Sequence, residues 1–305
     1  MLFSLVGGSF HPMINNTRSL LECEDLCFSY GADSYALSNV NFHVLEGEFV
    51  ALLASNGSGK STLIRLLAGL LKPASGSIFV AGAEIRSLSD KQLYGRMGFL
   101  AQNPMDQLFG MTVAEDVSFG PRNLGFCETE VQTRVKDALD SVGAVHLETR
   151  AIHHLSFGEQ KRVALAGVLA MSPTILLLDE VTAGLDPAGE MHMMNLLNRL
   201  NRQQGITIVF ATHSIDLLPL CADRIYVLER GRVLMNESTE KIFNEREILD
   251  QAGLRLPYIS SLFHDMKRYD GFPIDGLPLT VQAARRQLLA MLPERVWNDD
   301  GRHKP

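Results

Sequence analysis

A glycine-rich run followed by lysine and serine is the clearest chemical feature of the chain. The run reads Ala54-Ser55-Asn56-Gly57-Ser58-Gly59-Lys60-Ser61-Thr62 and fits a phosphate-binding loop, with Ala54 in place of the first glycine. In such a loop, backbone N–H groups and a helix N-terminus surround the β-phosphate of a nucleotide. We expect the Lys60 ammonium to reach the β and γ oxygens and the Ser61 hydroxyl to hold Mg²⁺. An alanine at position 54 is strained only if the backbone there needs a positive φ.

Two adjacent carboxylates, Asp179 and Glu180, come directly after the apolar run 175–178. The carboxyl ends of buried strands are where open α/β sheets bind their ligands. We expect Asp179 to hold Mg²⁺, directly or through water, and Glu180 to polarise an attacking water. Because adjacent side chains of a strand point to opposite faces, the two carboxylates should have different roles. The alternative is a solvated acidic pair at the end of a strand.

The elements that must position these residues alternate between two kinds of pattern. Helical spacing of apolar residues predicts helices over 61–71, 128–142 and 160–171. Strands are predicted at 20–30, 36–44, 49–53, 174–178 and 207–211. This alternation predicts an α/β fold with a mostly parallel sheet covered on both faces. A strand, a glycine-rich loop and a helix follow one another over 49–71, which is the order that a phosphate loop requires.

Composition divides the chain into three parts. Residues 1–18 are polar and without periodicity, so we expect a flexible leader. Residues 19–240 carry the alternating pattern and the chemical motifs, and we expect one nucleotide-binding domain there. Residues 241–305 are punctuated by prolines and predict a small accessory domain, with a helix over 281–292. The alternative for this last part is a disordered, solvated tail.

Charge and cysteine content exclude several classes of protein. The net charge of −7 argues against nucleic acid as a partner, because phosphate-backbone binding normally needs a basic face. We expect reduced thiols in a cytosolic protein, with Cys23 and Cys27 buried and structural rather than zinc-binding. The first residues lack a basic segment, so we expect no signal peptide. Apolar runs are far shorter than the roughly 20 residues of a membrane-spanning helix.

A third motif gives the chain a family resemblance. Leu155-Ser156-Phe157-Gly158-Glu159-Gln160 precedes a predicted helix and resembles the signature sequence of the ABC ATPases. Further positions match the family in order. They are Tyr30 for the aromatic that stacks on adenine, Gln102 for the glutamine of the loop facing the membrane partner, Ala183 to Asp186 for the turn linking two subunits, and His213 for the histidine that contacts the γ-phosphate.

The resemblance implies a fold and a chemistry. The fold would be a P-loop NTPase cassette with a mostly parallel sheet, an antiparallel β subdomain and a helical signature subdomain, followed by the small C-terminal domain. The cofactors would be ATP and Mg²⁺. Catalysis would use Glu180, His213 and Gln102, and Mg²⁺ would be held by Ser61, Gln102 and Asp179. ATP would lie on Tyr30 and the loop from Ser55 to Thr62, and would be contacted by Ser156 and Gly158 of a second subunit.

Four positions depart from the family pattern. Besides Ala54, Phe157 replaces the first glycine of the signature, Glu159 replaces its glutamine and Val181 replaces the proline after the acidic pair. None of these changes removes a side chain that touches phosphate, so we expect an active ATP-hydrolysing translocase. A regulatory module without turnover would have lost Glu180 or His213. ABC ATPases that act on ribosomes or DNA usually have two cassettes or a long coiled coil, and neither feature is present.

Within the family the chain is most similar to the energy-coupling-factor ATPases, in particular those of cobalt and nickel importers. The stretches that carry this similarity are 101–109, 155–171, 253–257 and 277–280. The resemblance implies a second ATPase subunit, identical or related, a transmembrane coupling subunit and a substrate-binding membrane subunit. It places the chain peripherally on the cytoplasmic face of the cell membrane. It also implies that the tail helps to hold the dimer together. Vitamin import by the same machinery is the alternative to cobalt or nickel import.

Overall fold

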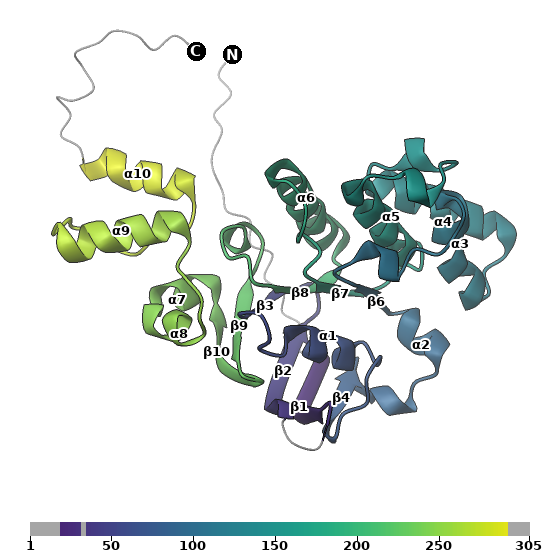
Figure 1. The fold of residues 1–305 in the computed structure, drawn as a ribbon, viewed down its shortest axis with the longest axis horizontal. Coiled ribbons are helices and arrows are strands. Elements are labelled where there is room, and N and C mark those ends of the chain that lie inside the picture. The colour runs from purple at the N-terminus through teal and green to yellow at the C-terminus, as the bar shows by residue number, and fades with distance from the viewer. Residues whose placement is uncertain (1–18, 32–34, 292–305) are drawn as a thin grey trace, which may run out of the picture.

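The computed structural model of the chain describes residues 19–31 and 35–291, and within them the chain forms two sheets with helices around them (Figure 1). The leader predicted at 1–18 and the last residues of the tail lie outside the described part. The smaller sheet is antiparallel and has the order β2-β1-β4-β5. Its strands are β1 (Ser19–Ser29), β2 (Tyr35–Leu45), β4 (Ser75–Val80) and β5 (Ala83–Glu84).

The larger sheet has six strands in the order β10-β9-β3-β8-β7-β6. All its neighbouring strands are parallel except the pair β9 and β10. Its central strands are completely buried and apolar because helices or the smaller sheet cover both faces. The strands are β3 (Phe49–Leu53), β6 (Met97–Leu100), β7 (Ile175–Asp179), β8 (Thr207–Thr212), β9 (Arg224–Glu229) and β10 (Arg232–Ser238).

Two apolar cores lie on opposite faces of the larger sheet. One contains the antiparallel sheet and α1 (Lys60–Leu67), with α2 (Asp90–Tyr94) at its edge. The other contains the helices drawn above the sheet in Figure 1. These helices are α3 (Val113–Leu124), α4 (Glu128–Ser141), α5 (Phe157–Leu169) and α6 (Pro187–Gln204). Alternate residues of β3 enter the two cores, so this strand is fixed from both sides.

The C-terminal helices differ in how they are anchored. α7 (Thr239–Asn244) and α8 (Arg246–Gln251) bury apolar residues in the main core. α9 (Tyr258–Tyr269) and α10 (Val281–Met291) instead share a small core of their own, centred on Phe263, Ile274 and Ala284. The helix predicted over 281–292 is therefore present as far as the described residues extend. The domain division at residue 240 stays a prediction.

Local chemistry explains where elements differ from the predicted ones. α1 ends at Leu67 rather than at residue 71, because Gly69 has a φ of 74° that a helix cannot contain. α5 begins three residues earlier than predicted, because Ser156 and Glu159 form a capping box around its first turn. Cys23 is buried, but Cys27 is only half-buried, so the prediction was wrong for Cys27. A break in strand register between the two residues, with Asp25 at positive φ, turns Cys27 away from the core.

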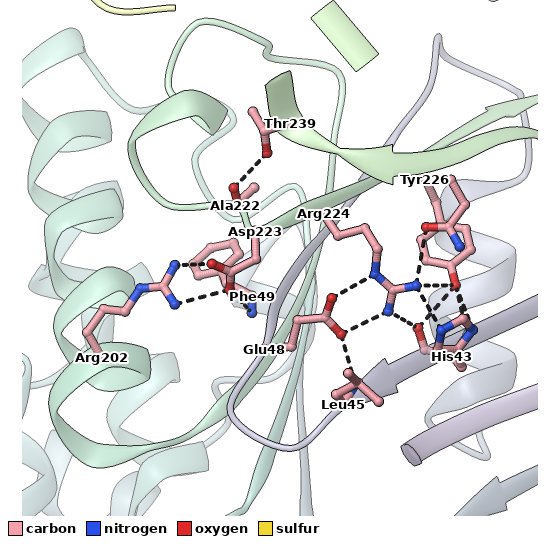
Figure 2. A network of polar contacts seen from close by, with 11 residues as sticks. His43, Leu45, Glu48, Phe49, Arg202, Ala222, Asp223, Arg224, Tyr226 and Thr239 are labelled. Carbon is pink, nitrogen blue, oxygen red and sulfur yellow. Dashed lines mark hydrogen bonds and ion pairs between the residues drawn. The ribbon is translucent and has the colours of Figure 1, made fainter. Parts of the chain in front are cut away.

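A polar network ties the antiparallel sheet to the start of β3 (Figure 2). Arg224 on β9 forms two bonds to the Glu48 carboxylate, at 2.7 and 2.8 Å, and donates to the His43 carbonyl on β2 at 2.8 Å. One residue before Arg224, the Asp223 carboxylate accepts bonds from the Phe49 backbone N–H and from the guanidinium of Arg202 on α6. These bonds fix the chain where it enters the strand that leads to the phosphate loop.

The Glu48–Arg224 pair provides a stability prediction. Glu48→Gln keeps the size of the side chain and its bond to the Leu45 N–H, but it leaves the half-buried Arg224 guanidinium without a counter-charge. We expect the free energy of unfolding to fall by about 3 kcal/mol in urea denaturation. Glu128→Gln, which breaks an exposed ion pair with Arg122, is the matched control and should change stability far less. Equal effects of the two variants would contradict the role given to the network.

Within the described residues, none of the helices is both long enough and apolar enough to cross a membrane.

Candidate functional site

The glycine-rich loop connects β3 to α1 and adopts a conformation that depends on glycine. Gly57 and Gly59 have φ values of 79° and 100°, in the left-handed region that side chains disfavour. A Cβ on Gly59 would also lie 2.8 Å from the Leu37 side chain and 2.9 Å from the Ala36 carbonyl oxygen. Ala54 is buried and is not among the residues with positive φ, so alanine causes no strain at the first position of the loop.

Lys60 lies at the first position of α1 with only 4% of its surface exposed. Its Nζ donates to the carbonyl oxygens of Ala54 at 2.9 Å and of Ser55 at 3.1 Å. The same ammonium lies 3.4 Å from Oε1 of Glu180. A buried cation needs such partners, and these hold the ammonium within the curve of the loop, where phosphate oxygens would bind.

Ser61 and Asp179 form the second contact between the loop and the end of β7. The Ser61 hydroxyl donates to Oδ1 of Asp179 at 2.9 Å, and Asp179 is 1% exposed. Burial raises the pKa of the Asp179 carboxyl, and the hydrogen bond from Ser61 opposes this shift. A hydroxyl beside one carboxylate fits Mg²⁺, which usually binds one or two carboxylates and takes its remaining ligands from phosphate and water.

Glu180 is the centre of a cluster of functional groups. Its carboxylate accepts a hydrogen bond from Nε2 of Gln102 at 3.3 Å and lies 3.1 Å from Nδ1 of His213, whose side chain is half exposed. The φ of Glu180 is 48°, an uncommon value for a residue with a side chain and one that recurs at functional sites. Asp179 and Glu180 thus contact different partners, as their adjacent positions at the end of a strand predicted.

Most of the predicted site residues line a cleft of about 610 Å³ at the carboxyl ends of β3, β7 and β8. Tyr30 lies at its rim with 66% of its surface exposed, and its hydroxyl is 3.2 Å from the Thr62 hydroxyl. Its role in stacking on adenine stays a prediction. The lining consists of Tyr30, Ala36, Asn56, Gly57, Gly59, Lys60, Ser61, Thr62, Gln102, Glu180, Ala183 and His213.

Comparison with known proteins identifies the family. The ABC transporter family matches residues 37–183. A putative ABC transporter ATP-binding protein of Geobacter sulfurreducens is 48% identical over 87% of this chain and 95% of its own length. An energy-coupling factor transporter ATP-binding protein of Methanocaldococcus jannaschii is 42% identical over 90% of this chain and 99% of its own. The chain belongs to the ABC transporter ATP-binding proteins of the energy-coupling factor type.

Solved structures agree with this assignment. The cbiO1 protein of Clostridium perfringens, described as part of the ABC transporter complex cbiONQ, is 42% identical and has a TM-score of 0.69 over 81% of this chain and 99% of its own. A dimeric ATP-binding cassette bound to ADP and Pi is 30% identical, with a TM-score of 0.65 over 72% of this chain and 98% of its own. The predicted family and cassette fold are confirmed, and the chain is an ATPase.

The lining of the cleft does not include Ser55, Ser58 and Asp179, although each adjoins a lining residue in the chain. Of the predicted residues of this ABC ATPase, the signature residues Ser156 and Gly158 also lie outside the lining. They lie at the N-terminus of α5, where the Ser156 hydroxyl accepts a bond from the Glu159 N–H and the Glu159 carboxylate accepts one from the Ser156 N–H. The bond from the Ser156 backbone lowers the pKa of the Glu159 carboxyl, so glutamate caps the helix in its charged form. The signature thus presents an ordered helix N-terminus, separate from the phosphate loop of its own chain.

The sequence did not predict a role for one buried residue of the signature helix of this ABC ATPase. Lys161 is 2% exposed and donates to carbonyl oxygens just after the acidic pair. The sequence feature that could have pointed to Lys161 is its position one helical turn after Phe157, which places both side chains on the same face of the helix.

The geometry of Gly59 provides a prediction about nucleotide binding. Gly59→Ala should abolish ATP binding, because the methyl group collides with the Ala36 carbonyl and displaces the loop. Titration with a fluorescent ATP analogue measures this. Gly205→Ala is the matched control: Gly205 has a φ of 72°, but no atom lies within 4 Å of the added carbon. That variant should lose about 1 kcal/mol of stability and bind ATP normally; normal binding by both variants would contradict the loop geometry.

Proposed function

We propose that the chain hydrolyses Mg²⁺-ATP as a dimer and couples this reaction to cobalt or nickel uptake by membrane subunits. The observation that carries the proposal is the arrangement of Lys60, Gln102, Glu180 and His213 in one cleft, with Ser61 bonded to Asp179 beside them. Lys60 supplies positive charge for the phosphates, Glu180 supplies a base for the attacking water, and Ser61 with Asp179 supplies a site for Mg²⁺. Phosphoryl transfer requires these three components.

The proposed reaction begins when phosphate oxygens replace Glu180 as partners of the Lys60 ammonium. The Glu180 carboxylate then accepts a proton from a water that attacks the γ-phosphorus, while the bond from that phosphorus to the β–γ bridging oxygen breaks. ADP and inorganic phosphate leave. Gln102 and His213 orient the carboxylate and the γ-phosphate. Mg²⁺, held by Ser61 and Asp179 with Gln102 as a further ligand, would supply charge neutralisation at the phosphates.

A dimer is proposed because the signature and the phosphate loop of one chain lie apart. Ser156 is exposed at the N-terminus of a helix, and such a terminus favours an anion. A second subunit, identical or related, would bring its phosphate loop to this terminus and complete an ATP site. The proposed accessory domain at 241–305 would strengthen the pairing through apolar residues exposed near its surface, namely Tyr258, Leu262, Tyr269, Phe272 and Val281.

A membrane coupling subunit is the proposed occupant of an apolar groove of about 370 Å³ beside the Gln102 loop. Phe109 and Phe119 line it with exposed rings packed edge to face, and Met171 lines it too. Gln107 is also part of the lining, and its side chain bonds the Ala101 N–H at 2.8 Å and the Phe99 carbonyl at 3.0 Å. A helix seated in the groove would therefore bear on the segment that positions Gln102 and, through it, Glu180. With this occupant, the proposed location of the chain is the cytoplasmic face of the membrane.

The choice of cobalt or nickel rests on the resemblance of residues 101–109 and of the tail to the ATPases of metal importers. The similarity to cbiO1, which is part of the cbiONQ complex, supports the same choice. In this proposal the transported ion binds to a separate membrane subunit. Vitamin import is the second candidate, because several relatives that are 41–42% identical are described only as energy-coupling factor ATP-binding proteins.

The role of Glu180 is tested by Glu180→Gln. We expect the variant to hydrolyse ATP at least about a hundredfold more slowly, because the amide cannot accept the proton of the attacking water. It should also accumulate as an ATP-bound dimer in sedimentation velocity with Mg²⁺-ATP. Glu240→Gln, at an exposed position in α7, is the control and should behave as the wild type. Unchanged turnover in Glu180→Gln would refute the assignment.

The transported substrate is tested by gentle purification of the chain from native membranes and mass spectrometry of the proteins that accompany it. One transmembrane coupling subunit with a single dedicated metal-type binding subunit is the expected result. Several alternative binding subunits, or a second related ATPase, would favour vitamin import. The absence of any membrane protein would contradict transport and point to a non-transport ABC ATPase.

A further inference from the structure

The signature helix α5 lies directly against the chain segment that follows the acidic pair. The contact is made by Lys161, whose Nζ donates to the carbonyl oxygens of Val181 at 2.8 Å and Ala183 at 2.7 Å and lies 3.4 Å from that of Glu180. The lysine is almost completely buried. An ammonium has three donors, and here three carbonyl oxygens of one short segment converge on them.

Phe157 adds a second contact one helical turn earlier. Its ring packs on Gly184, where a Cβ would lie 2.9 Å from the ring and where φ is 77°. The Lys161 Nζ lies 5.1 Å from the centre of the same ring, within the range of a cation–π interaction. Phe157, which stands where the family has glycine, therefore packs beside the lysine and contacts the same segment at Gly184.

The hydrogen-bond partners of the buried Lys161 are main-chain carbonyls. Burial lowers the pKa of Lys161 to about 8, while the negative charge of Glu180 opposes this shift. The ammonium thus stays mainly protonated at neutral pH. Its partners are not side chains that can rotate away, so its position and that of the main chain from Glu180 to Ala183 determine each other.

We propose that Lys161 is a positioning residue for ATP hydrolysis, which locks the main chain of the Glu180 segment to the signature helix. The inference rests on the roles proposed above for Glu180 and Ser156. The N-terminus of α5 would contact ATP held by the partner, and Glu180 serves the chain's own ATP. Lys161 makes the N-terminus of α5 and the Glu180 segment move as one body. Closure of the dimer on one ATP therefore positions the Glu180 carboxylate at the other ATP.

Lys161 does not line the cleft, so a positioning role should change kcat and KM differently. Loss of its ammonium should lower kcat and leave nucleotide affinity unchanged. Lys161→Met keeps the length of the side chain and removes all donors, which leaves the Val181 and Ala183 carbonyls unpaired. Lys161→Gln keeps two N–H donors on a shorter chain and should be intermediate.

The test uses the full chain with four variants. They are Lys161→Met, Lys161→Gln, Lys136→Met as the control at an exposed lysine of the neighbouring helix α4, and Glu180→Gln. The measurements are kcat and KM for Mg²⁺-ATP, the Kd of a fluorescent ATP analogue and the thermal unfolding midpoint. Lys161→Met should lower kcat roughly ten- to a hundredfold, with KM and Kd within about twofold of the wild type. Lys136→Met should match the wild type in all four.

Several results would overturn the inference. One is a wild-type kcat in Lys161→Met. Another is a loss of kcat that only follows weaker ATP binding. A third is failure of both Lys161 variants to fold, which would show that the role of the lysine is only structural. Glu180→Gln distinguishes failure of the inference about Lys161 from failure of the proposed function. If that variant is inactive while Lys161→Met is fully active, the inference alone is wrong. If Glu180→Gln turns over normally, the assignment of Glu180 is wrong and the inference falls with it.

Discussion

The buried contact between the Lys60 ammonium and the Glu180 carboxylate is the interaction around which the site is organised. It joins the ends of β3 and β7, and His213 reaches the same carboxylate from the end of β8, the strand that lies between them. Three neighbouring parallel strands thus deliver a cation, a carboxylate and an imidazole to one edge of the sheet. Because charges taken out of water need partners, the pair also holds both side chains in place until phosphate oxygens compete for the lysine.

The rest of the fold fixes the two ends of this contact. On the β3 side, the network of Glu48, Arg224 and Asp223 sets where the strand begins, and the two cores on either face keep it straight. On the β7 side, Lys161 and Phe157 of the signature helix hold the segment that contains Glu180. The phosphate loop is therefore tied to the antiparallel sheet, whereas the Glu180 carboxylate is tied to the helical part of the cassette. Relative movement of these two parts would alter the distance between the Lys60 ammonium and this carboxylate.

Motifs made of residues close together in the sequence were predictable. Contacts between residues far apart in the sequence were not. The strands at 49–53, 174–178 and 207–211, the glycine-rich loop and the acidic pair follow from apolar runs and fixed spacings. Helices α3 and α6 were missed; Thr112 with Glu115 and Asp186 before Pro187 are the capping signals that mark their starts. The contacts of Glu48 with Arg224 and of Lys161 with Val181 could not be read from the sequence, because each depends on how separate elements pack. The resemblance already implied that Ser156 and Gly158 serve the ATP of a second subunit, and their absence from the lining of the cleft that contains Lys60 agrees with this.

The central claim is that each ATP site combines the phosphate loop of one chain with the signature of another. The most direct test mixes the untagged wild-type chain with a tagged chain carrying Lys60→Met, which should not bind ATP itself, and adds Mg²⁺ with an ATP analogue that is photoreactive at the γ-phosphate. After illumination, mass spectrometry locates the label in each chain. Label is expected on the peptide containing Ser156 and Gly158 of the tagged chain. Label confined to the untagged chain would contradict the central claim.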